Sequence, residues 1–125
     1  MFKINEDKSI YLTRGDIANI KVSANKSDGT PYTFLVGDVV CIKVVKKKDY
    51  GSVLLQKEIT VSEEGTEVSI YLTKDETKFG ELINKPTTYW YEVELNPRTQ
   101  PQTIIGHDED GEKQFILYPE GSDIL

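Results

Sequence analysis

The sequence contains one cysteine, Cys41, and one histidine, His107, among its 125 residues. A single cysteine excludes an intrachain disulfide, and Cys41 lies in an apolar run, where a thiol is usually buried and unreactive. His107 has no matching nucleophile, because no serine lies in the G-x-S-x-G setting that exposes one on a strained turn. These absences predict a protein that is not an enzyme.

Long apolar runs and long runs of positive charge are also missing. No stretch approaches the roughly 20 apolar residues that a membrane helix needs, and the N-terminus lacks the basic-then-apolar layout of a signal peptide. The net charge of −6 repels the phosphates of nucleic acids. The basic run Lys46-Lys47-Lys48 lies where lysines usually solvate a strand end. We therefore expect synthesis in the cytoplasm and no binding to membranes or nucleic acids.

The sequence offers no set of residues for a metal ion or a cofactor. It has no glycine-rich phosphate loop and no paired Cys/His ligands. The acidic segment Asp108-Glu109-Asp110 precedes Gly111, but an EF-hand placed on that glycine would have Gly106 and Leu117 at two of its ligand positions. Neither side chain can supply an oxygen ligand. A solvated hairpin tip is predicted in place of a calcium site, and we expect no cofactor.

Short alternating apolar segments separated by turns are what the sequence does contain. Val, Ile, Thr and Tyr are abundant, and they favour the half-buried surface of a sheet. The length fits a single domain, residues 1–125. We predict an all-β fold, an antiparallel β-sandwich of immunoglobulin-like type with roughly seven to nine strands and one short helix. The expected strands are residues 2–4, 10–12, 18–23, 39–47, 53–59, 67–72, 87–95, 102–106 and 113–118, and residues 32–35 are expected to be a brief extended stretch. The last two strands are expected to form a hairpin.

One segment departs from the alternating pattern. Thr73 and Glu76 have the spacing of a capping box, in which each side chain bonds the other residue's backbone amide. Phe79, Leu82 and Ile83 then recur at helical spacing, which places them on one face. A proline three residues later ends the segment. We predict a helix of about three turns or less across one end of the sandwich.

Two glycine-aspartate pairs mark expected turns. Arg14-Gly15-Asp16 spells the integrin-recognition tripeptide, but Gly15 and Asp16 are more simply turn formers before a strand. Asp28 and Gly29 lie in a second cluster of turn residues. We therefore assign these residues to turns and not to an adhesion site.

Aromatic residues provide the expected interaction surface. If alternate residues of 87–95 face the core from Tyr89 onward, Trp90 faces outward among acids, and exposed Trp is a common interface anchor. Tyr71 is a second outward candidate. Two alternatives remain open: a loop or the helix covers Trp90, or the two faces are reversed. Glu92 and Glu94 share a strand face without a sugar-stacking cleft, so a charged outer face is preferred to a glycosidase site.

The order of these pieces resembles a known family. The turn at residues 12–16, the turn at residues 28–32 and the Gly37-Asp38 entry to the next strand occur in the order found in the N-terminal domain of the baseplate upper protein family. That family belongs to the tail genes of phages and prophages of Gram-positive bacteria. The resemblance covers the layout of residues 4–95, and residues 96–125 do not match it closely.

The resemblance implies a β-sandwich that builds part of a phage tail or baseplate. Its partners would be other tail or baseplate proteins or copies of itself, and its location would be the virion. No catalytic or ligand residue carries over, because the shared residues form turns. The leading alternative is a carbohydrate- or cell-surface-binding module that uses Tyr and Trp as stacking platforms. A hydrolase using the His107 loop and a small cytoplasmic regulator are weaker alternatives.

Overall fold

The computed structural model describes residues 1–5, 7–26, 28–46, 52–106 and 111–120. Strands dominate these residues, and the one helix among them is a single 3₁₀ turn. In that part of the chain no helix has the length and apolar character needed to cross a membrane. The elements are β1 (Phe2–Ile4), β2 (Ile10–Thr13), β3 (Ala18–Val22), β4 (Val39–Val45), β5 (Val53–Thr60), β6 (Val68–Leu72), η1 (Glu76–Lys78), β7 (Thr87–Leu95), β8 (Gln102–Ile105) and β9 (Lys113–Tyr118).

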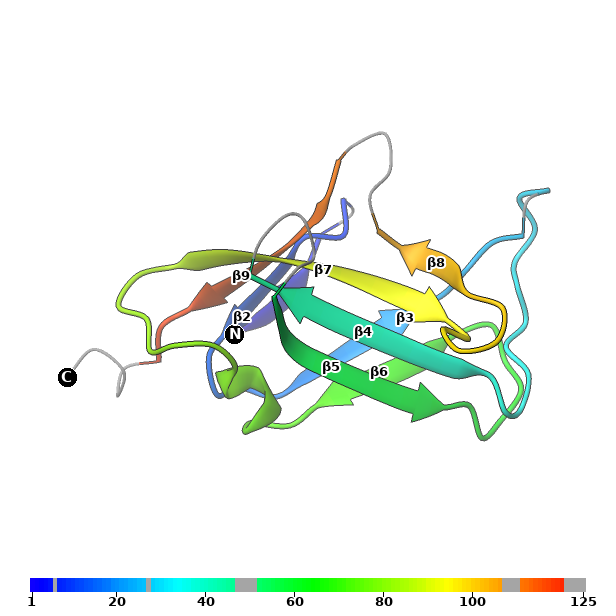
Figure 1. The fold of residues 1–125 in the computed structure, drawn as a ribbon, viewed down its shortest axis with the longest axis horizontal. Coiled ribbons are helices and arrows are strands. Elements are labelled where there is room, and N and C mark those ends of the chain that lie inside the picture. The colour runs from blue at the N-terminus through cyan, green and yellow to red at the C-terminus, as the bar shows by residue number, and fades with distance from the viewer. Residues whose placement is uncertain (6, 27, 47–51, 107–110, 121–125) are drawn as a thin grey trace.

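The strands form two sheets that enclose the core (Figure 1). The larger sheet has the order β1-β2-β9-β7-β4-β5, with β8 also paired to β7, and the smaller sheet is the pair β3-β6. The predicted all-β, sandwich-like fold with one short helix is confirmed. Most pairs are antiparallel, but β2 and β9 run parallel, with Ile10 opposite Phe115 and Leu12 opposite Leu117. The sequence pattern did not indicate this parallel pair.

Alternation along the strands places the core where the sequence predicts it. In β7 the side chains of Tyr89, Tyr91, Val93 and Leu95 are buried, and those between them are partly exposed. The strands β3 and β6 alternate between buried and exposed residues along their whole length. Tyr91 is the largest fully buried side chain, and its hydroxyl donates to the Lys8 carbonyl at 2.5 Å. Burial of the ring raises the pKa of Tyr91 above its usual value.

The predicted hairpin between residues 102–106 and 113–118 is wrong. Within the described residues, β8 and β9 both pair with the same edge of β7 and not with each other. Val93–Leu95 pairs with β8, and Thr87–Tyr91 pairs with β9. The two strands therefore follow one another along β7, which already pairs with β4 on its other edge. The expected hairpin tip at residues 107–110 lies outside the described residues.

The segment after β6 forms the capping box but not a helical face. The Glu76 carboxylate accepts from the Thr73 amide at 2.9 Å, and the Thr73 hydroxyl accepts from the Glu76 amide at 3.2 Å. The helix ends at Lys78, so Phe79 is buried while Leu82 is 70% exposed. The break comes at Phe79, whose backbone is extended with a ψ of 159°, and the left-handed Gly80 that follows, with a φ of +76°, keeps the chain out of helical geometry. The interpretation of Phe79 and Leu82 as one buried face is therefore wrong.

Candidate functional site

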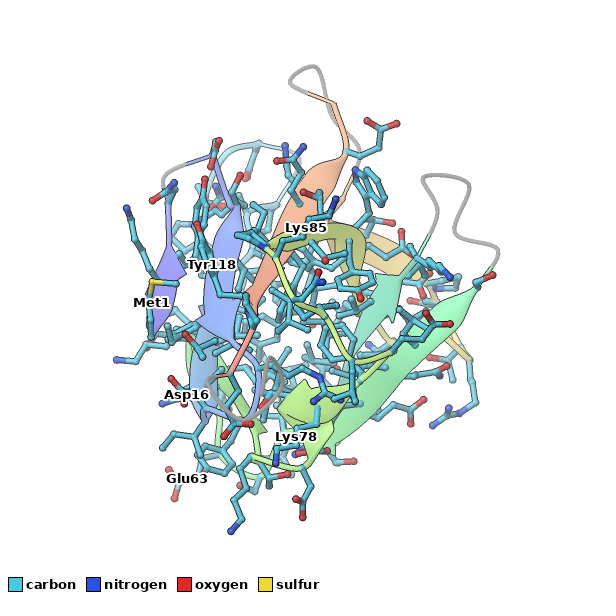
Figure 2. The ribbon with its side chains drawn as sticks, turned by 90° about the vertical axis from the view of Figure 1, so that its left-hand side faces the viewer. Met1, Asp16, Glu63, Lys78, Lys85 and Tyr118 are labelled. Carbon is cyan, nitrogen blue, oxygen red and sulfur yellow. The ribbon has the colours of Figure 1, made fainter. Side chains whose placement is uncertain are left out.

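The Arg14-Gly15-Asp16 turn is part of the packed structure. Arg14 is only 7% exposed, and its guanidinium donates to the Lys78 carbonyl at 3.0 Å. The Asp16 carboxylate pairs with the N-terminal ammonium of Met1 (Figure 2). Gly15 has a φ of +89°, which favours glycine. Arg14 is therefore packed inside the structure, and the Asp16 amide donates to the Thr13 carbonyl at 3.0 Å, which closes a turn before β3.

The Asp28-Gly29 turn is likewise built for local geometry. The Asp28 carboxylate accepts from the backbone amide of Thr30 at 3.0 Å and from its hydroxyl at 2.6 Å. These hydrogen bonds lower the pKa of Asp28 below its usual value. Gly29 has a φ of +88°. The turn brings Pro31 back beside Asn25, where the two residues form an isolated bridge.

Trp90 lies in an apolar cleft at one end of the sandwich. The cleft has a volume of about 450 Å³ and lies between the start of β5, the start of β7 and the segment after Phe79. We call it the Trp90 cleft, and it is lined by Lys46, Leu54, Gly80, Glu81, Leu82, Ile83, Thr87, Thr88, Tyr89 and Trp90. Trp90 is partly buried there, so it is neither fully exposed nor covered.

A bulge in the β4–β5 pair contributes to this cleft. Val44 pairs with Leu55 and Val45 pairs with Val53, which leaves Leu54 as an extra residue on β5. Leu54 joins the lining of the cleft, and Val53 is 48% exposed next to it in the chain. Leu54 is partly buried and also packs against the core, so the Trp90 cleft lies at the edge of the core.

Tyr71 lies away from Trp90. It is 47% exposed on β6, in the smaller sheet, whereas Trp90 lies on β7 in the larger sheet. The inward residues of β6 are Val68, Ile70 and Leu72, so Tyr71 points away from the core. The structure does not bring the two predicted interface residues together. Only Trp90 has other apolar side chains in a cleft around it.

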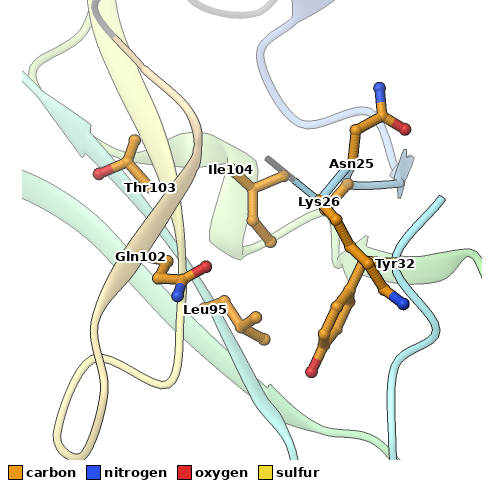
Figure 3. A pocket seen from close by; sticks show the side chains of 8 residues that line it. Asn25, Lys26, Tyr32, Leu95, Gln102, Thr103 and Ile104 are labelled. Carbon is orange, nitrogen blue, oxygen red and sulfur yellow. The ribbon is translucent and has the colours of Figure 1, made fainter. Parts of the chain in front are cut away.

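A second hollow was not predicted from the sequence. It lies between β8 on one side and residues 23–26 and Tyr32 on the other, and Figure 3 shows Gln102 and Thr103 facing Tyr32 across it. It consists of two adjoining volumes of about 460 and 480 Å³ that share Ala24, Asn25, Thr103 and Ile104. We call the pair the basic groove, because the described residues that line it include Lys8, Lys21, Lys26 and Lys113 and no acid.

The floor of the basic groove is apolar and its aromatic residue is held in place. Leu95 and Ile104 lie between the two walls (Figure 3). The Tyr32 hydroxyl donates to the Asp38 carboxylate at 2.8 Å, and the Tyr32 ring packs edge-on against Phe34 at 5.2 Å. Burial, and then the bond to Asp38, raise the pKa of Tyr32. The ring is therefore a neutral, positioned part of the wall.

The outer face of the larger sheet carries a buried thiol and an ion pair. Cys41 is 1% exposed, and burial, with a smaller effect of Glu58, raises its pKa. Such a thiol is a poor nucleophile. The Glu58 carboxylate forms a two-pronged salt bridge with Arg98 at 2.5 and 2.6 Å. No three metal-ligating side chains cluster among the described residues, and His107 lies outside them.

Comparison with known proteins found no matching family model, curated protein or solved structure. The immunoglobulin-like description and the resemblance to the baseplate upper protein family therefore stay predictions.

Proposed function

We propose that this chain is a structural docking module of a phage or prophage tail or baseplate. It acts by protein–protein contact and not by catalysis. The family resemblance supports the setting, and the Trp90 cleft supports the mode of action. The observation that carries the proposal is a cleft at one end of the sandwich that Trp90 lines together with Leu82, which is 70% exposed.

The cleft has the features of an interface hot spot. Tryptophan is enriched among interface residues that contribute most to binding, and such residues lie in pockets that lose water on binding. Burial of an exposed leucine contributes about 1.5–3 kcal/mol, and Leu82 offers this gain at no cost to the core. Lys46 and Glu81 at the lining supply polar groups of both signs at the rim.

The lining favours a protein partner over a sugar. A carbohydrate site combines a stacking ring with several hydrogen-bonding groups, since each sugar hydroxyl taken out of water needs a partner. The lining of the Trp90 cleft has polar side chains, but it also includes Leu54, Leu82 and Ile83. Leu82, which is 70% exposed, matches an apolar partner surface better than a saccharide.

Two substitutions in the Trp90 cleft test the proposal. The wild-type chain, Trp90→Ala and Leu82→Asp are mixed with the proteins of the neighbouring tail genes, and binding is measured by pull-down and light scattering. We expect the wild type to bind one of them or itself, and each variant to bind at least tenfold more weakly, about 1.4 kcal/mol. Leu82→Asp guards against misfolding, because that side chain is exposed.

Tyr71→Ala is the matched control, since it removes an exposed aromatic ring from the other sheet. It should leave binding within twofold of the wild type. A wild-type chain that stays a strict monomer and binds none of the neighbouring proteins would refute the docking function. Equal losses in Tyr71→Ala and Trp90→Ala would refute the assignment to this cleft.

A further inference from the structure

We propose that the basic groove binds an extended acidic segment of a partner protein. The first observation is the contrast in charge. The whole chain carries a net charge of −6, yet the described residues lining the groove include four lysines and neither aspartate nor glutamate. Complementary charge of this kind steers partners and selects among them.

The shape of the groove favours an extended chain over a small anion. Its two volumes, of about 460 and 480 Å³, share four lining residues and therefore lie side by side. Lys26 lines one part, Lys8, Lys21 and Lys113 line the other, and Asn25 lines both. A single phosphate or carboxylate would occupy only a fraction of this volume. A peptide with several acidic residues can place them near the exposed lysines Lys8, Lys21 and Lys26.

The strands beside the groove offer free edges. Among the described strands, β8 pairs only with β7, and β3, which leads into the groove wall, pairs only with β6. Free edges have backbone groups that can bond an added strand, and pockets for alternate side chains then give specificity. Gln102 and Thr103 are exposed on β8, and Ser23 is exposed just after β3. The groove thus combines main-chain pairing with charge recognition.

The apolar floor completes the match to an alternating peptide. Leu95 and Ile104 lie at its base, with Tyr32 on the wall (Figure 3). In an extended peptide, successive side chains point to opposite sides. Apolar residues would face this floor while acidic residues reach the lysines. Nucleic acid fits less well, because the net charge of the whole chain repels a phosphate backbone.

Lys113 is the most buried of the four lysines. It is only 6% exposed, and its ammonium lies 3.5 Å from the Gly111 carbonyl. Asp7 lies near it: hydrogen bonds from Ser9, and to a smaller extent the charge of Lys113, lower the pKa of Asp7. Lys21 and Lys26 are exposed. Their substitution therefore tests charge recognition without removing a buried side chain.

The test uses a labelled peptide of eight residues in which glutamate alternates with valine, and a control peptide with glutamine in place of glutamate. Fluorescence anisotropy reports the affinity for the whole chain, and NMR shifts locate the site. We expect the acidic peptide to bind at least tenfold more tightly than the glutamine peptide. Binding should weaken in 0.5 M salt, and the shifts should map to residues 21–26 and 102–106.

The double variant Lys21→Glu/Lys26→Glu should weaken peptide binding at least tenfold. The control Lys74→Glu/Lys85→Glu makes the same change in net charge at exposed lysines that do not line the groove, and it should stay within twofold. Equal binding of both peptides, equal losses in both double variants, or shifts outside the groove would overturn the proposal. Tighter binding of a hyaluronan oligosaccharide, an eight-base oligonucleotide or inorganic phosphate would also overturn it.

This proposal adds a second surface to the proposed docking function and requires no native partner for its test. Trp90→Ala should leave peptide binding unchanged. Failure of the peptide to bind would therefore refute the proposal for the basic groove alone. The docking function proposed for the Trp90 cleft would still be tested by its own variants.

Discussion

The connection between β6 and β7 has two halves that differ in how they are held. In the first half, residues 73–79, the polar groups are bonded inward. Thr77 is fully buried, and its hydroxyl bonds the Asp16 carbonyl at 2.7 Å. Phe79 follows and packs edge-on against Tyr89 and Phe115, at ring distances of 5.4 and 5.5 Å. This half closes one end of the core.

The second half, residues 80–86, begins at the left-handed Gly80 and lies mostly in solvent. Leu82 is 70% exposed, only three residues after the buried Phe79. The two side chains have similar apolar character but opposite environments. The first half therefore contributes to the core and to the stability of the fold. The apolar side chain of Leu82 in the second half is left in solvent.

The largest expected effect comes from the buried half. Phe79→Ala removes a ring that is 7% exposed and touches two other rings. Such a cavity lowers the free energy of unfolding by about 3–5 kcal/mol. Urea denaturation followed by tryptophan fluorescence measures the change. A loss of unfolding free energy below about 1 kcal/mol would show that the first half does not close the core, and the two halves would then not differ in their contribution to stability.

A smaller effect comes from the capping box. The Lys57 ammonium bonds Glu76 at 2.8 Å, and this contact, followed by the Thr73 amide, lowers the pKa of Glu76 below its usual 4.5. A carboxyl whose pKa falls on folding stabilises the native state above its unfolded pKa. That stability is lost as the pH falls through the folded pKa. Glu76→Gln should therefore cost about 0.5–1 kcal/mol at pH 7.

The cost of Glu76→Gln should shrink as the pH falls from 6 to 3, since the wild-type carboxyl then gains a proton. Urea denaturation at each pH provides the measurement. Glu63→Gln, at an exposed position in the β5–β6 connection, is the control and should show a smaller difference at every pH. A Glu76→Gln cost that does not change with pH would contradict the role assigned to the charged contact.

The sequence pattern predicted those parts of the fold that depend on residues close together in the chain. Alternation located β3, β6 and β7 and the inward faces of these strands, and the spacing of Thr73 and Glu76 located the capping box. Pairing partners were harder, because β2 and β9 lie about 100 residues apart and no local signal marks their parallel contact. The hairpin expected between residues 102–106 and 113–118 was wrong because both strands pair with β7, and the turn residues between them do not indicate that partner.

The candidate sites were predicted in part. Outward alternation indicated Trp90, but helical spacing placed Leu82 in the core. The extended Phe79 and the left-handed Gly80 end the helix before Leu82, which is exposed. The basic groove left no sequence signal, because the residues that line it lie far apart in the chain: Lys8, residues 21–26, Tyr32, residues 102–106 and Lys113. Single lysines far apart in a sequence look like ordinary surface residues until folding gathers them.

Leu82→Ala should have the smallest effect on stability, and it tests directly whether the second half of the connection is separate from the core. Because the side chain is 70% exposed, its truncation should change the free energy of unfolding by less than about 0.5 kcal/mol. The same substitution should weaken docking by about tenfold if the second half contacts a partner. Phe79→Ala should show the opposite balance, with stability lost first. If Leu82→Ala lowers the free energy of unfolding by more than about 1 kcal/mol, the side chain packs in the core. Both halves of the connection would then stabilise the fold.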